Sequence, residues 1–561
     1  MVAPELICAN WTSGNINCAR TGTHGCMGCR LVTYCGQECQ RSHWIHHKPS
    51  CRSPLRKETW EPAWLLEHRT PAFLGDAQET SFGPSKYLWG NVPALDVLRL
   101  DRNEGAEYDR ALRVLFAASG DLRHLVKTIA QLPSSYSGEI EITLNDRDFD
   151  IVGRNIILLL VGLIVDDIDV AVDCIIHLWY SALIRESDLN ILQKQVRPLI
   201  DDICRKIAAK PLGTILRKTW TFKGRSLRVA LARSEWNQLL RLLDVPPGLN
   251  AQQALAIRAD ITLAESRKDY RDRYMCCIPP VHRVAFHKFC EDGLVVPFGF
   301  PRGEFQVPNP TIYDSSNTWP MRDNADPRHG WPAEDIERTS TGAATADIYG
   351  KLFYYLRGII SSFLTRLHSL SASLQVLQVD AASLPDYLDP EPFSRIDVSN
   401  ISDSGWLGID RTLAYMIPLL QPPRENPCAT LITLFMNAVE EAMTDEDRKE
   451  MTSRSESLLQ YLPPKRRPIS SYDPELVKVI MALDLVMDYN LVFDRYTDKL
   501  EFQKAAEVVN AAMKDTHTII DKWPYRLKLR PGQPGAQEEF DRCLGSGLST
   551  KERYVEWRRT G

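Results

Sequence analysis

Apolar positions predict a strand–helix–strand–helix unit in the first third of the chain. The continuous apolar run from Leu112 to Ala118 is typical of a buried parallel strand, and Ser119-Gly120-Asp121 interrupts it. A helix is expected next, with one apolar face formed by Leu122, Leu125, Val126 and Ile129. Residues 139–144 alternate as a second strand, and a helix is predicted over residues 147–165. This βαβ order predicts an α/β fold with a Rossmann-like sheet.

Proline content and apolar periodicity divide the rest of the chain into predicted domains and connecting segments. Residues 56–85 are punctuated by proline and predict a linker before an α/β domain at 86–295. A Pro-rich connecting segment is expected at 296–345, and residues 346–530 are predicted to form a largely helical C-terminal half, with helices at 346–374, 429–445, 473–490 and 500–520. The charged residues 531–561 are expected to be a loosely held tail.

Composition narrows the function classes. With 44% hydrophobic and 25% charged residues, the 561-residue chain has the composition of an ordinary globular protein. Its net charge of −5 gives no general footprint for nucleic acid, so no direct nucleic-acid binding is expected. The apolar stretch 156–165 is too short to cross a membrane. The first five residues have neither the basic nor the apolar run of a secretory leader, and a cytoplasmic location is expected, with the nucleus as the alternative.

Cysteine and histidine are concentrated at the start of the chain. Seven cysteines and one histidine in the first 51 residues have spacings that fit two zinc ions: Cys8, Cys18, Cys26, Cys29, Cys35, Cys39, His47 and Cys51. Zinc takes four thiolate or imidazole ligands in a tetrahedron, and a site closed by four protein ligands is structural. A disulfide framework is the alternative, but an odd count of seven cysteines without a leader argues against it.

These residues resemble a MYND-type zinc finger at residues 1–55. The matching pattern is Cys26-x2-Cys29-x5-Cys35-x3-Cys39-x7-His47-x3-Cys51. The resemblance implies interleaved ligands, with Cys8, Cys18, Cys35 and Cys39 on one zinc and the other four on the second. It also favours His47 over the neighbouring His43 and His46. The chain departs from the family in placing nine residues, instead of two, between Cys8 and Cys18.

The resemblance also implies a partner. MYND fingers dock short proline-containing peptides, and Gln40 and Trp44 match positions that line the peptide groove in some members. The alternative for Trp44 is an aromatic residue of the finger's small core.

A second resemblance covers residues 86–190. The stretches Trp89–Asp96, Ser119–His124 and Leu144–Asp148 are similar to an uncharacterised domain near the start of axonemal dynein assembly factor three, which recurs in fungal proteins that carry MYND fingers. The resemblance implies a methyltransferase-like fold and no known reaction.

The turn after the first predicted strand is also a candidate cofactor site. In a nucleotide or S-adenosylmethionine site, Ser119, Gly120 and Asp121 would approach the cofactor, and Asn145 or Asp146 would hold its ribose. Only one glycine occupies the turn, so a structural βαβ unit without a cofactor is the favoured interpretation. His124 is interpreted as a turn or interface residue.

The leading hypothesis is therefore a zinc-binding interaction or scaffold protein whose finger docks a proline-containing peptide. The alternative is a divergent S-adenosylmethionine-dependent methyltransferase that uses the βαβ unit at 112–146. No catalytic residues are predicted, and no membrane partner is expected.

Overall fold

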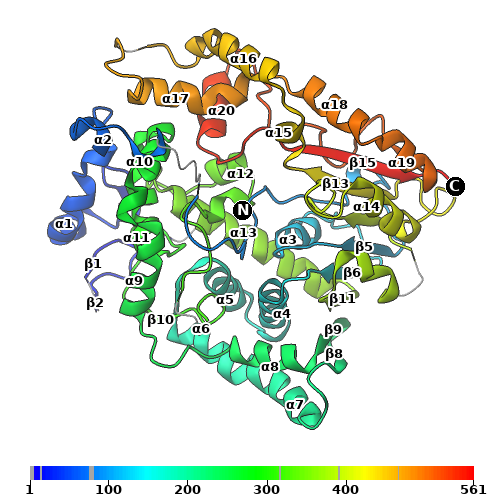
Figure 1. Ribbon diagram of the computed structural model, residues 1–561. Helices are drawn as coiled ribbons and strands as arrows, with labels where there is room; N and C mark the ends of the chain where they lie inside the picture. Colours follow the sequence, from blue (N-terminus) through cyan, green and yellow to red (C-terminus); the bar gives the residue numbers. More distant parts are fainter. Residues whose placement is uncertain (1–5, 13–14, 75–80, 315–317, 389–391, 465) are drawn as a thin grey trace.

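A nine-stranded mixed sheet organises the computed structural model of the protein (Figure 1). The structure describes residues 6–12, 15–74, 81–314, 318–388, 392–464 and 466–561; residues 1–5, on which the expectation about a leader depends, lie outside this part. The strand order is β14-β15-β13-β12-β5-β6-β11-β9-β8. From β13 to β9 the neighbouring strands are parallel, whereas β15 and β8 run antiparallel to their neighbours.

The predicted βαβ unit forms the centre of this sheet. Strand β5 (Leu112–Phe116) pairs in parallel with β6 (Ile140–Asn145), and α3 (Arg123–Ala130) connects them. Helix α4 (Phe149–Ile164) follows, with nearly every side chain buried. Because β5 and β6 are covered by helices, their side chains are buried on both faces, which explains their apolar runs.

The C-terminal half contributes strands to the same sheet, which corrects the prediction of a largely helical region. These strands are β11 (Ala372–Leu377), β12 (Arg395–Asp397), β13 (Thr430–Phe435) and β14 (Ala511–Met513). The helix predicted at 429–445 is wrong, since β13 occupies its first part and only the short α15 (Ala438–Ala442) follows. All six residues of β13 are buried, and an apolar run of that length does not distinguish a buried strand from a helix.

The expected tail supplies a strand inside the sheet. Strand β15 (Arg553–Arg559) lies between β13 and β14, antiparallel to both. Trp557 of this strand is fully buried, and its Nε1 donates a hydrogen bond to Thr433 Oγ1 at 2.9 Å. The last residues are therefore held by the sheet and do not form a loose tail.

Helices cover both faces of the sheet. The long helix predicted after the Pro-rich segment is α13 (Ile348–Ser369), which packs against α3 and α5. The helix predicted at 473–490 is present in shorter form as α17 (Pro474–Ala482). The prediction of a helix over 500–520 is wrong in its second half, since α19 (Phe502–Val508) ends early and β14 follows it. The remaining longer helices are α5 (Ile168–Tyr180), α6 (Glu186–Ile191), α7 (Arg197–Ile207), α8 (Arg233–Arg241), α9 (Ala251–Thr262), α10 (Lys268–Cys277), α11 (Pro280–Asp292), α12 (Ala333–Arg338), α14 (Ile409–Met416), α16 (Asp445–Ser453), α18 (Asn490–Lys499) and α20 (Ala536–Leu544).

One hairpin and one antiparallel strand pair complete the body. Strands β8 (Ile215–Phe222) and β9 (Arg225–Ala232) form the edge of the sheet opposite β14, and β7 (Leu183–Arg185) pairs with β10 (Phe305–Pro308) outside it. Among the described residues, no helix combines the length and the apolar character needed to cross a bilayer.

The segment expected as a linker is packed against the body. Helix α2 (Ala63–Leu66) is mostly buried, and the backbone N–H of Ala63 donates to Asp272 Oδ2 at 2.8 Å. Arg69 forms an ion pair with the buried Asp269 through both terminal nitrogens. Both carboxylates lie on α10, so this helix holds the connection between the finger and the sheet domain.

A buried carboxyl at the end of β12 predicts a pH-dependent stability. Burial raises the pKa of Asp397 to about 6, and its Oδ2 has no hydrogen-bond partner among the described residues. A carboxyl whose pKa is raised on folding contributes stability below its unfolded pKa, and that contribution is lost as the pH rises through 6. We therefore expect Asp397→Asn to change stability little at pH 4 and to stabilise the protein relative to wild type by up to about 3 kcal/mol at pH 7.

Urea unfolding of both proteins at the two pH values measures this difference. The exposed Asp260 provides a control, because replacing this surface side chain by asparagine should keep the stability within about 0.5 kcal/mol of wild type. A stability difference for Asp397→Asn that does not grow with pH would contradict the prediction.

Candidate metal centre and finger surface

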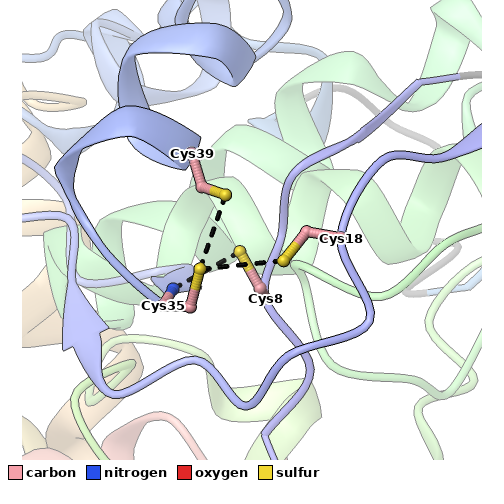
Figure 2. Close-up of side chains that lie close together, drawn as sticks. All are labelled: Cys8, Cys18, Cys35 and Cys39. Atoms are coloured by element: carbon pink, nitrogen blue, oxygen red, sulfur yellow. Dashed lines mark hydrogen bonds between the residues drawn. The ribbon is translucent and has the colours of Figure 1, made fainter.

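The first four-ligand cluster consists of two cysteines from the start of the finger and two from the region where α1 begins. The ligand atoms of Cys8, Cys18, Cys35 and Cys39 all lie within 4.8 Å of one another (Figure 2). The Cys35 Sγ atom lies 3.7 Å from Cys18 Sγ and 3.4 Å from Cys39 Sγ. The backbone N–H of Cys35 donates to Cys8 Sγ at 3.4 Å, the contact expected of an electron-rich sulfur ligand.

A short hairpin explains the unusual spacing of the first two ligands. Strands β1 (Trp11–Thr12) and β2 (Asn15–Ile16) pair antiparallel between Cys8 and Cys18, so the intervening residues fold back on themselves. The Cys8 N–H also donates to the Arg20 carbonyl at 2.9 Å. Nine residues of spacer therefore leave the two sulfurs in one cluster.

The second cluster is fully buried. The ligand atoms of Cys26, Cys29, His47 and Cys51 also lie within 4.8 Å of one another. The Cys29 Sγ atom is 3.3 Å from His47 Nε2, and Cys26 Sγ is 3.8 Å from Cys51 Sγ. The first pair comes from a tight turn, while the last two ligands lie on α1 (Gln37–Cys51).

The donor sets fit zinc. The hydrogen bond from Cys29 lowers the pKa of the Cys26 thiol, which favours the thiolate form that zinc binds. Thiolates and imidazole in groups of four, closed to solvent, are the ligands of structural Zn²⁺. A divalent cation would supply the positive charge that such crowded, buried sulfurs need. The two clusters thus form two Cys/His zinc-binding sites.

The neighbouring histidines have other roles. His43 is buried, its Nδ1 lies 3.0 Å from the Tyr34 hydroxyl, and its ring lies near that of Trp11. His46 is exposed. Among these three histidines, the structure places only His47 in a four-ligand group.

The predicted peptide-binding residues lie on the outer part of α1. Gln40 and Trp44 are both half-buried and are separated by about one helical turn. The guanidinium of Arg52 lies 5.7 Å from the centre of the Trp44 ring, and the His47 ring meets Trp44 edge-on at 6.1 Å. Two apolar side chains of the finger are strongly exposed, Met27 at 84% and Ile45 at 76%. Arg52 was not predicted from the sequence as part of this surface, although a position about two helical turns after Trp44 places it on the same face of the helix.

The finger is packed against the body beside α10 and α11 (Figure 1). Trp11 Nε1 donates to the Gly299 carbonyl at 2.6 Å, and the Ala346 N–H donates to the Arg30 carbonyl at 3.0 Å. The first contact reaches the segment expected to be a Pro-rich connection, and the second reaches the residue directly after it. A Cβ atom on Gly25 would lie 2.5 Å from the Ala343 carbonyl oxygen, so the absence of a side chain there permits the close approach.

The candidate cofactor residues lie close together, but their polar groups form hydrogen bonds with one another and with neighbouring backbone carbonyls. The Gly120 N–H, at a residue with a φ of 55°, donates to Asp146 Oδ2 at 3.0 Å. Asn145 is buried and donates to the carbonyls of Ala117 and Val379. The Ser119 N–H donates to the Asn145 carbonyl at 2.7 Å. The backbone and side-chain groups that would approach a cofactor are therefore used within the fold.

Two further residues of this turn have structural partners. Asp121 is buried, forms an ion pair with Arg123 at 2.6 Å and accepts the Gly90 N–H at 2.7 Å. His124 is buried as well, and its Nδ1 accepts the Leu95 N–H at 2.9 Å. His124, interpreted from the sequence as a turn or interface residue, instead packs inside the fold, with its ring stacked 6.4 Å from that of Phe116 in β5.

Comparison with known families identifies two parts of the chain. Residues 15–51 match the model of the MYND finger, and residues 88–184 match a domain of unknown function (DUF4470). No curated protein and no solved structure matches the chain. The finger match begins after Cys8, so the assignment of this ligand depends on the geometry of the first cluster. The chain therefore carries a MYND finger, a zinc-binding module typical of protein interaction, on an α/β body that contains a domain of unknown function.

Proposed function

We propose that this protein is a zinc-dependent interaction or scaffold protein whose finger docks a short proline-containing peptide on Gln40 and Trp44. The observation that carries the proposal is the position of Trp44 on a helix anchored by three ligands of the two clusters, Cys39, His47 and Cys51. Structural zinc holds the helix, and the Trp44 ring is left partly accessible. Proline residues pack well on such aromatic surfaces because a proline-rich peptide loses little entropy on binding.

The body would act as a Rossmann-like scaffold. With the β8–β9 hairpin at the edge left aside, the strands β11-β6-β5-β12-β13, numbered along the chain, read 3-2-1-4-5, which is the order of a doubly wound sheet. This order favours the methyltransferase-like alternative, with S-adenosylmethionine at the end of β5. The hydrogen bond from Gly120 to Asp146 and the single glycine of the turn count against it.

We also propose that the domain at residues 86–190 is related to the one in axonemal dynein assembly factor three, and that the protein is located in the cytoplasm.

A quantitative pull-down with the zinc-loaded full chain tests the docking role. Gln40→Ala combined with Trp44→Ala should reduce captured proline-containing partners at least tenfold, because both groove side chains are shortened. Gln195→Ala with Trp406→Ala is the matched control, since it removes an exposed glutamine and an exposed tryptophan outside the finger. Unchanged capture by the finger variant would show that the docking role is wrong.

A further inference from the structure

The surface beside Trp44 carries three cations. Arg41, Lys48 and Arg52 are exposed, and they lie three, four and eight residues from Trp44. We call these three residues the basic face of α1. At these spacings their side chains project from the same side of the helix as Trp44 or from its borders. Arg52 is in contact with the tryptophan ring itself.

These cations are free of carboxylate partners. Among the described residues, none of the three forms an ion pair, although ion pairs are common elsewhere on the body. Residues 6–56 contain six arginine or lysine residues and one acidic residue, Glu38, in a chain whose net charge is −5. The finger is therefore a basic element of an acidic protein.

The negative charge of the zinc clusters is buried and does not neutralise the basic face at the surface. Seven thiolates on two Zn²⁺ ions would carry a net charge of about −3. All seven sulfurs belong to buried or half-buried residues, whereas the basic face is exposed. A ligand lying over Trp44 would therefore meet the cations first, and exposed charges act mainly over distances of about 8–10 Å at physiological salt.

Stabilisation of the helix explains only part of this pattern. Lys48 lies in the last turn of α1 and Arg52 directly after it, where cations interact favourably with the helix dipole. Arg41 lies in the first half of the helix, where a cation gains nothing from the dipole. Arg41 thus distinguishes a recognition role from a helix-stabilising role.

We infer that the finger selects acidic proline-containing peptides, with proline on Trp44 and flanking aspartate or glutamate on the basic face of α1. This inference rests on the proposed docking function and adds the charge of the partner. Electrostatic complementarity of this kind increases the association rate and excludes basic competitors.

Selection from a displayed peptide library tests the inference. The library holds random twelve-residue peptides with one proline fixed at the centre, and the bait is the zinc-loaded full chain. The enriched peptides should carry a net negative charge, and a labelled member should bind about three- to tenfold more weakly to the Arg41→Gln, Lys48→Gln double variant. The same peptide should also bind more weakly as NaCl rises from 50 to 500 mM.

Two controls separate the possible failures. Lys194→Gln with Lys210→Gln removes two exposed lysines outside the finger and should leave binding unchanged, and each variant must retain two zinc ions per chain. Enriched peptides that depend on Trp44 but are neutral or basic would overturn the charge inference and leave the docking function intact. Enrichment that survives Trp44→Ala, or no enrichment at all, would overturn both.

Discussion

Replacing Cys29 with serine will lower the zinc content from two ions per chain to about one and will destabilise the whole protein. Cys29 belongs to the fully buried second cluster, and its sulfur lies 3.3 Å from His47 Nε2. A serine hydroxyl cannot replace a thiolate ligand. Structural zinc contributes on the order of 10–16 kcal/mol to the folding of isolated fingers, so this loss exceeds what other contacts of the short segment can offset.

The effect should extend beyond the finger because the finger packs against the body. Its contacts include the Trp11–Gly299 hydrogen bond and the Ala346–Arg30 hydrogen bond beside the start of α13. Unfolding the finger would expose the apolar side chains of Leu31 and Val32, which lie in the same buried cluster as the body. We therefore expect a lower midpoint of thermal unfolding, and not only a local change.

Metal analysis by mass spectrometry together with differential scanning fluorimetry checks this prediction. His46→Ala is the control, because His46 is exposed and lies outside both clusters; it should retain two zinc ions and the wild-type midpoint. Two zinc ions retained by Cys29→Ser would refute the ligand assignment. A loss of zinc with an unchanged midpoint would instead refute the coupling of the finger to the body.

Deletion of residues 549–561 will prevent folding of the body. These residues contain β15, which pairs with β13 along one edge and with β14 along the other. Without it, β14 would lose its strand partner and β13 would be unpaired along one edge. The buried Glu556, which accepts the backbone N–H groups of Ile519 and Ile520, would also be missing. An exposed, apolar sheet edge promotes aggregation, so we expect the truncated chain to be insoluble.

A point variant gives a measurable counterpart to the deletion. Trp557→Ala removes a fully buried indole that packs against Phe502 and bonds to Thr433, and should lower the free energy of unfolding by about 3–5 kcal/mol. Arg558→Ala, at the exposed neighbouring position, should stay within about 0.5 kcal/mol of wild type. Urea unfolding followed by circular dichroism measures both. Equal, small effects would mean that the end of the chain is dispensable.

Local patterns in the sequence predicted the two Cys/His groups that fit zinc and the central βαβ unit. Ligand spacing is a local property: Cys35-x3-Cys39 and His47-x3-Cys51 place side chains on one side of a helix turn whatever the rest of the chain does. Likewise, the apolar run of β5, the turn at Gly120 and the alternating β6 lie within one short stretch, and their parallel pairing needs only the intervening α3.

Only the tertiary structure decided which distant segments complete the sheet. Strand β12 pairs with β5 although about 280 residues separate them, and β15 lies inside the sheet although it ends the chain. Short buried strands carry no periodicity that distinguishes them from helix segments, so β13 was predicted as a helix. The hydrogen bonds of the candidate cofactor residues were equally hidden from the sequence. Gly120 donates to Asp146, and Asn145 donates to the Val379 carbonyl, which lies more than 200 residues away.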